Sequence, residues 1–206
     1  MLAIAGGKGG SGKTTTTLGL AAAFDRPTLA VDGDADMPNL HSLAAVDREP
    51  TLAEAAADPA TRAHPHPDHA DVSVLPAPRG GSDLPSALSR VRDAADAVLV
   101  DCPAGAGPDA VAPLRVADAT LLVTSLCAPA LRDTAKTAAM ARAVGTPPVG
   151  VVLTRTRLAP AGVADLVGCP VLASIPSARP PVLEDSAVRA AFDDLAAALE
   201  REEDLL

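Results

Sequence analysis

A glycine-rich loop near the start of the chain constrains its fold more than any other feature of the sequence. The loop runs Gly7-Lys8-Gly9-Gly10-Ser11-Gly12-Lys13-Thr14, which fits the pattern G-x-x-x-x-G-K-[ST] at every fixed position. Of the 17 basic residues only three are lysines, and two of these lie in the loop. A compact ammonium group approaches nucleotide phosphates where a planar guanidinium does not fit. The loop is therefore predicted to bind phosphate groups.

The residues on either side of the loop support this prediction. The apolar run 2–5 before the loop predicts a short buried strand, and residues 13–24 after it predict a helix. In this arrangement the glycines let backbone N–H groups turn inward around an anion, and the start of the helix adds a favourable dipole. The alternative is a glycine-rich turn without a ligand, but strand, spacing and helix all agree with a phosphate site.

Apolar segments alternate with helical patterns along the rest of the chain, which is typical of a parallel sheet covered by helices. Strands are predicted at 2–5, 28–32, 72–75, 97–101, 119–124, 148–153 and 171–175. Helices are predicted at 13–24, 51–57, 82–95, 108–116, 129–144, 160–167 and 187–200. We therefore expect an α/β protein with a three-layer P-loop NTPase fold, in which a mostly parallel central sheet carries helices on both faces. Residues 1–206 are expected to form a single domain.

Aspartates follow two of the predicted strands at the edge where a ligand is expected. Ligands bind beyond the carboxyl ends of parallel strands, so the loop, Asp32 and Asp101 should meet there. Lys13 is expected to neutralise the phosphates and the Thr14 hydroxyl to ligate Mg²⁺, with Asp101 holding the ion through water. Asp32 and Asp34 are two residues apart, so both could project from one side of an extended segment. Acidic turns are the alternative for all three carboxylates.

Lys8, directly after the first glycine, makes the loop similar to the deviant Walker A loop of the MinD/ParA ATPases, and closer to MinD than to ParA. Further segments match this family in order: 31–34 with Asn39, Leu75-Pro76-Ala77, 98–105, Leu131-Arg132-Asp133 and Ser174-Ile175-Pro176. The resemblance implies an enzyme that binds Mg-ATP and hydrolyses it in a nucleotide-sandwich dimer. It also implies a molecular switch in cell division, positioning or partitioning.

The resemblance assigns roles to individual residues. Lys8 would reach across the dimer to the partner's ATP, Asp34 would position or activate the attacking water, and Thr15 would contact the α-phosphate. The implied catalytic residues are Lys8, Lys13 and Asp34. The implied metal residues are Thr14, Asp32 and Asp101. The implied nucleotide-binding residues are Gly7, Lys8, Gly9, Gly10, Ser11, Gly12, Lys13, Thr14 and Thr15.

Two segments depart from the family pattern. Residues 153–157 lack the asparagine that often contacts adenine, so Thr154 or Arg157 would have to replace it. Residues 200–206 carry four acids and one arginine, where MinD has a basic membrane-binding helix. We therefore expect no direct membrane anchor. A regulatory module with little turnover and a metal-cofactor carrier ATPase remain as alternatives, although the carrier is disfavoured by the lack of paired cysteines.

The cysteines and the net charge indicate the cellular location of the chain and the kinds of partner it binds. The three cysteines, Cys102, Cys127 and Cys169, are widely spaced and predict neither disulfides nor a metal site. There is no leader pattern, so a cytoplasmic location is expected. The net charge is −9 without a basic cluster, which makes DNA binding unlikely. The histidine-rich run 64–69 is predicted to be a solvated loop. The expected partners are a second copy of the chain and an unidentified protein.

Overall fold

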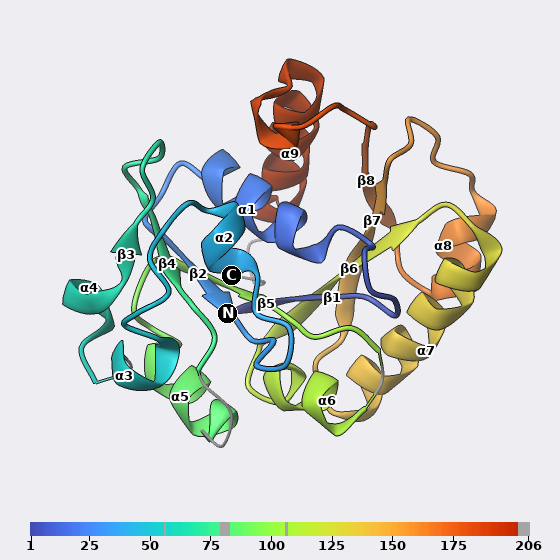
Figure 1. Cartoon of the computed structure of the whole chain (residues 1–206). Coiled ribbons are helices and arrows are strands. Elements are labelled where there is room, and N and C mark those ends of the chain that lie inside the picture. Colours follow the sequence, from blue (N-terminus) through green and yellow to red (C-terminus); the bar gives the residue numbers. More distant parts are fainter. Residues whose placement is uncertain (56, 79–82, 106, 202–206) are drawn as a thin grey trace.

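A central, mostly parallel sheet organises the chain in the computed structural model, which describes residues 1–201 apart from 56, 79–82 and 106 (Figure 1). Across the described residues the sheet has eight strands in the order β3-β4-β2-β5-β1-β6-β7-β8. They are β1 (Leu2–Ala5), β2 (Thr28–Asp32), β3 (His64–Pro65), β4 (Val72–Leu75), β5 (Ala97–Asp101), β6 (Ala119–Ser125), β7 (Pro148–Thr154) and β8 (Val171–Ile175). All neighbouring pairs are parallel except β3 with β4. The predicted fold class is confirmed.

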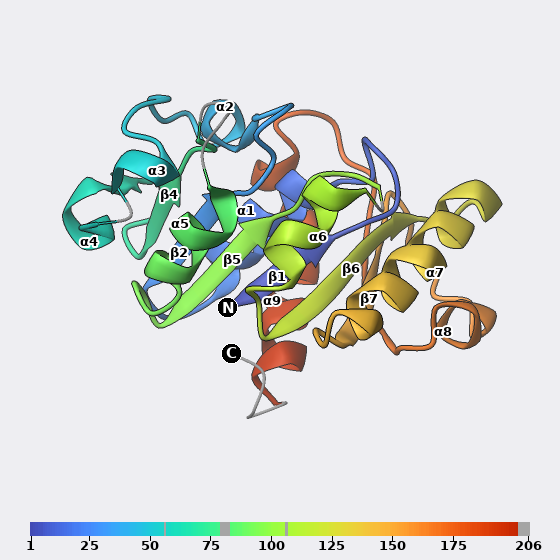
Figure 2. The same ribbon diagram turned by 90° about the horizontal axis from the view of Figure 1, so that it is seen from below.

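Helices cover both faces of this sheet, with α5, α6 and α7 in front of the strands in Figure 2. One face carries α1 (Lys13–Ala23), α2 (Leu40–Leu43), α9 (Ser186–Glu200) and the short η1 (Val182–Glu184). The other face carries α3 (Leu52–Ala55), α5 (Leu84–Val91), α6 (Pro108–Leu114), α7 (Ala128–Ala143) and α8 (Gly162–Val167). The helix α4 (Pro59–Arg62) precedes β3. The three layers follow from strands that are apolar on both sides.

Small and branched aliphatic side chains fill the hydrophobic cores on the two faces of the sheet. The chain has two phenylalanines and neither tryptophan nor tyrosine, so few large aromatic rings are available for packing. Phe192 of α9 is among the largest fully buried side chains, and its ring lies directly over Gly19 of α1. A β-carbon at position 19 would overlap the Phe192 ring. Glycine inside a helix is unfavourable, and here it is explained by the space that this ring occupies.

The structure corrects several predicted elements at their ends. The helix predicted at 51–57 is α3 over Leu52–Ala55, and the one predicted at 82–95 is α5 over Leu84–Val91. The helices α2 and α4 were not predicted, since four-residue helices leave little periodic signal. The expected loop at 64–69 is wrong at its start, where His64 and Pro65 pair antiparallel with β4. Proline is compatible with an edge strand because its missing N–H can face outward.

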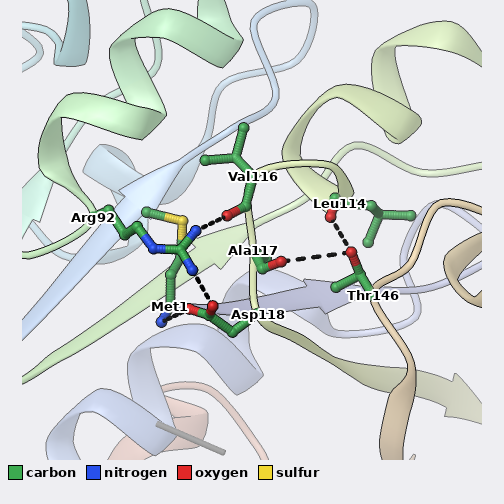
Figure 3. Close-up of polar contacts among 7 residues, drawn as sticks. All are labelled: Met1, Arg92, Leu114, Val116, Ala117, Asp118 and Thr146. Carbon is green, nitrogen blue, oxygen red and sulfur yellow. Dashed lines mark hydrogen bonds and ion pairs between the residues drawn. The ribbon is translucent and has the colours of Figure 1, made fainter.

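Polar contacts hold the amino-terminal edge of the sheet, opposite the glycine-rich loop (Figure 3). The Asp118 carboxylate accepts hydrogen bonds from the Met1 ammonium group at 2.8 Å and from the Arg92 guanidinium. Arg92 also donates to the Val116 carbonyl, and the buried Thr146 hydroxyl donates to the Leu114 carbonyl. These contacts tie Met1, directly before β1, to the connections that lead into β5 and β6.

No helix within the described ranges combines the length and hydrophobicity that crossing a bilayer requires. The acidic end of the chain, from 202 to 206, lies outside the described residues.

Candidate functional site

The glycine-rich loop joins β1 to α1 at the carboxyl edge of the sheet and packs tightly against its neighbours. Gly7 abuts the α7 backbone at Asp133, where any β-carbon would overlap. Gly10 and Gly12 have φ angles of +72° and +100°, in the left-handed region that glycine adopts without strain. The loop therefore needs glycine at these positions for close approach and for backbone conformation.

A cleft with a volume of about 620 Å³ opens between this loop and the segment that follows β2. The glycine-rich loop and α1 contribute six of the lining residues, including Lys13, Thr14 and Thr15. The opposite wall contains Asp34, Met37 and Asn39 and the last two residues of α2. The complete lining is Gly9, Gly10, Gly12, Lys13, Thr14, Thr15, Asp34, Met37, Asn39, Ser42, Leu43, Asp101, Cys102, Ala104 and Arg155. The cleft is thus at the edge where a ligand was expected.

Asp32 and Asp101 are the last residues of β2 and β5, beneath the cleft. The two strands are neighbours in the sheet and pair with Asp32 opposite Asp101. Asp101 is 3 % exposed, and its Oδ1 atom is buried without a hydrogen-bond partner. Burial raises the pKa of Asp101 to about 7; the Asp32 charge adds to the rise, while the Thr14 hydroxyl and Lys13 oppose it. An unsatisfied buried carboxylate oxygen is unfavourable, so this position favours a bound cation.

Asp32 organises the segment after β2 rather than facing the cleft. Its Oδ2 atom accepts hydrogen bonds from the N–H groups of Asn39 and Leu40, both at 3.1 Å, and its Oδ1 atom accepts one from Asp34 at 3.0 Å. The side chain is fully buried, and this burial raises its pKa to about 6 despite the three N–H donors. Asp34 lines the cleft, whereas the Asp32 carboxylate accepts backbone hydrogen bonds from the segment that follows it.

Asp34 and Asn39 bring polar groups to the cleft wall. The half-buried Asp34 accepts a hydrogen bond from the Met37 N–H at 3.0 Å and lines the cleft. Asn39, the single asparagine of the sequence, accepts a hydrogen bond from the Thr14 hydroxyl at 2.9 Å. The segment after β2 is thereby tied directly to the start of α1.

Comparison with known proteins identifies the family of this chain. Residues 2–180 match the family model of the CobQ/CobB/MinD/ParA nucleotide binding domain. The chain belongs to this family. An uncharacterized ATP-binding protein of Methanocaldococcus jannaschii is 36% identical over 168 residues, which is 75% of this chain and 64% of that protein. The alignment thus spans slightly less than two thirds of that relative's length.

Solved structures of MinD proteins superpose on the whole fold. The cell division ATPase MinD of Pyrococcus furiosus has a TM-score of 0.85 at 31% identity, with 98% of each chain covered. The septum site-determining protein MinD of Pyrococcus horikoshii, solved with Mg-ADP, has a TM-score of 0.82 at 28% identity, covering 98% of this chain and 96% of the other. The resemblance to MinD seen in the sequence is confirmed.

The structure of this MinD/ParA family member brings most of the predicted residues to one place. Gly9, Gly10, Gly12, Lys13, Thr14, Thr15, Asp34 and Asp101 line the cleft. Within the loop Gly7 is half-buried, Ser11 is buried and Lys8 is exposed, while Asp32 is buried at the end of β2. Sequence reasoning missed the contact between Asn39 and Thr14, although Asn39 was among the residues that match the family.

Thr154 and Arg157, the two residues predicted to contact adenine, are not among the residues that line the cleft. Thr154 is 8 % exposed, and its hydroxyl donates to the Ser11 carbonyl at 2.7 Å. Arg157 lines a separate cavity beside β8 with Ser174 and Asp194. Arg155, which sequence reasoning did not single out, lines the cleft instead. Neither predicted side chain is presented to the cleft as a free donor.

The cysteines and histidines do not form a second centre. Cys102 and Cys169 are buried, and burial raises the pKa of both thiols. Cys127 is exposed at the start of α7, and the Ser125 hydroxyl contributes most to lowering the pKa of its thiol. Within the described residues, no three His, Cys, Asp or Glu side chains are gathered as metal ligands.

Proposed function

We propose that the chain is a MinD/ParA-like ATPase that binds Mg-ATP in this cleft and hydrolyses it in a nucleotide-sandwich dimer. It acts in the cytoplasm as a molecular switch in cell division, positioning or partitioning, and its nucleotide state is read by a protein partner. One ATPase domain over residues 1–206 carries this activity. The observation behind the proposal is the meeting of a glycine loop, the Lys13 ammonium and the Asp101 carboxylate at one cleft.

The Thr14 hydroxyl and the Asp101 carboxylate fit a Mg²⁺ ion. Both groups line the cleft, both offer oxygen ligands, and Asp101 Oδ1 is buried without a partner. Mg²⁺ is held in nucleotide sites by few protein oxygens, together with phosphate oxygens and water. When bound, the ion would neutralise phosphate charge. Asp32 supports this site from below by fixing the backbone of Asp34 and Asn39.

The remaining groups divide the work of binding and hydrolysis. Backbone N–H groups of the loop and the Lys13 ammonium bind the phosphates. Thr15, in the first turn of α1 and on the cleft lining, contacts the α-phosphate. Asp34 lines the cleft opposite the loop and orients the attacking water. Lys8, exposed at the loop tip, acts on the nucleotide of a second molecule.

We expect Lys13→Ala to weaken Mg-ATP binding by tenfold or more. Lys13 is 9 % exposed and lines the cleft, so it is shielded from bulk solvent at the position where the phosphates would bind. A charge-assisted hydrogen bond contributes ~1.5–3 kcal/mol, which corresponds to an effect of this size. Calorimetric titration of the purified chain with Mg-ATP measures the affinity of both forms.

Lys13→Arg is the matched variant, because it keeps the charge but replaces the compact ammonium with a planar group. We expect it to remain impaired, with an unfolding midpoint in urea close to that of the wild type. Equal affinities for the wild type and Lys13→Ala would remove the assignment of this loop as the phosphate site.

Phosphate release from Mg-ATP, measured with and without cell extract, distinguishes an ATPase from a regulatory module. An ATPase releases phosphate in at least one of the two conditions, whereas a regulatory module releases little in either. No observation on the described residues favours the metal-carrier alternative. Its cysteines would have to be paired at a surface, and Cys102 and Cys169 are buried.

A further inference from the structure

The end of β7 holds two successive carbonyl groups of the glycine-rich loop. The Thr154 hydroxyl donates to the Ser11 carbonyl at 2.7 Å, and the Arg155 guanidinium donates to the Gly10 carbonyl at 2.7 Å. These contacts join residues that are 143 and 145 positions apart in the chain. The Thr154 methyl group also packs against Gly12, where a β-carbon would lie 3.2 Å from it.

The two hydrogen bonds determine the direction of two N–H groups. In a trans peptide unit the C=O and N–H bonds point in opposite directions. Fixing the Gly10 carbonyl on Arg155 therefore turns the Ser11 N–H away from β7, and fixing the Ser11 carbonyl on Thr154 does the same for the Gly12 N–H. Within the described part of the chain, neither of these N–H groups donates a hydrogen bond to another residue.

An anion-binding concavity requires this arrangement, with carbonyls directed outward and N–H groups left free to converge. The geometry points to Thr154 and Arg155 as positioning residues that preorganise the glycine-rich loop for the phosphates of the nucleotide. This inference rests on the proposed function, since it explains how the loop is prepared for that ligand. It gives Thr154 a role other than contact with the base.

The backbone of Arg155 supports the inference. Its φ angle is +57°, in the left-handed region that residues other than glycine rarely adopt and that is unfavourable for a long side chain. Strained conformations of this kind persist where surrounding contacts hold them. Here the conformation directs the guanidinium over the loop, and the next residue, Thr156, is anchored by its N–H to the Ile175 carbonyl at 3.0 Å.

Substitutions at Thr154 separate the hydroxyl from the shape of the side chain. Thr154→Val keeps the shape and removes the donor, whereas Thr154→Ser keeps the donor. We expect Thr154→Val to weaken ADP binding about tenfold and Thr154→Ser to bind within about threefold of the wild type. Titrations with ADP are made with Mg²⁺ and also in EDTA, where the metal site cannot contribute.

Arg155→Gly tests the second contact, because glycine adopts a φ of +57° without strain. The variant should unfold in urea at a concentration equal to or above that of the wild type while its ADP affinity falls about fivefold or more. A residue with a purely structural role would not lower affinity while stability is kept. Arg155→Lys, which retains a donor, should recover part of the affinity.

Matched controls lie away from the cleft. The buried Thr120 hydroxyl donates to the Thr146 carbonyl at 3.2 Å, and Arg142 donates to the Gly168 carbonyl at 2.8 Å. Thr120→Val and Arg142→Lys should leave ADP affinity unchanged. If the wild type binds ADP and both Thr154→Val and Arg155→Gly bind it equally well, the positioning role is overturned and the proposed function stands. If the wild type binds no ADP in either buffer, both are overturned.

Discussion

Replacing Lys8 with alanine is expected to lower ATP turnover by about 100-fold or more and to weaken ATP-dependent dimerisation, while nucleotide binding by the monomer stays largely intact. Lys8 is exposed at the tip of the loop, whereas Lys13 lines the cleft. An ammonium in this position is accessible to a second molecule, where it would offset phosphate charge much as an arginine finger does in trans. The loss of one preorganised cation has an effect of this size.

Analytical ultracentrifugation with Mg-ATP measures the dimerisation, with Asp34→Ala as the background that slows hydrolysis. Lys136→Ala is the control, because Lys136 is the third lysine of the chain and lies exposed on α7, paired with Asp133 at 3.0 Å. If Asp34→Ala dimerises and the double variant with Lys8→Ala dimerises equally well, Lys8 does not act in trans. If no form dimerises at any ATP concentration, the regulatory-module alternative replaces the sandwich dimer.

The free energy of unfolding of the metal-free chain is expected to carry a contribution from Asp32 and Asp101 that is lost as the pH rises from about 4 to about 7. Burial raises the pKa of Asp101 from 3.8 to about 7 and that of Asp32 from 3.8 to about 6. Between these limits the folded chain holds protons that the unfolded chain has released, so stability falls with increasing pH. The shift at Asp101 alone corresponds to a loss on the order of 4 kcal/mol.

Urea denaturation between pH 4 and pH 8 in EDTA, for the wild type and Asp101→Asn, isolates this contribution. The neutral variant cannot lose a proton, so its stability relative to the wild type should increase across the window. Mg²⁺ with ADP should reduce the difference, because a cation compensates the ionised carboxylate. Asp193→Asn, at an exposed position on α9, should follow the wild type at every pH. Parallel curves for the wild type and Asp101→Asn would contradict the buried, unpaired carboxylate.

The P-loop, the strands and the edge on which the site lies follow from local pattern. A strand that is buried on both faces consists of an uninterrupted run of apolar residues, so its bounds can be predicted. Five strands lie at their predicted bounds: 2–5, 28–32, 72–75, 97–101 and 171–175. The loop needs specific residue types at fixed spacing, and parallel strands bring their carboxyl ends to one edge. Local chemistry therefore determined the fold class, the family and the expected position of Lys13, Thr14 and Asp101.

The tertiary structure alone decided what the individual side chains do at that edge. Asp32 and Asp34 look equivalent in sequence, yet Asp32 is buried under three N–H groups and Asp34 lines the cleft. Thr154 holds Ser11 although 143 residues separate them. Hydrogen-bond partners are determined by packing between distant segments, which leaves no periodic trace in the sequence. The sequence by itself thus determined which chemistry the chain can carry, and only the packing of β7 and β2 around the loop determined how that chemistry is arranged.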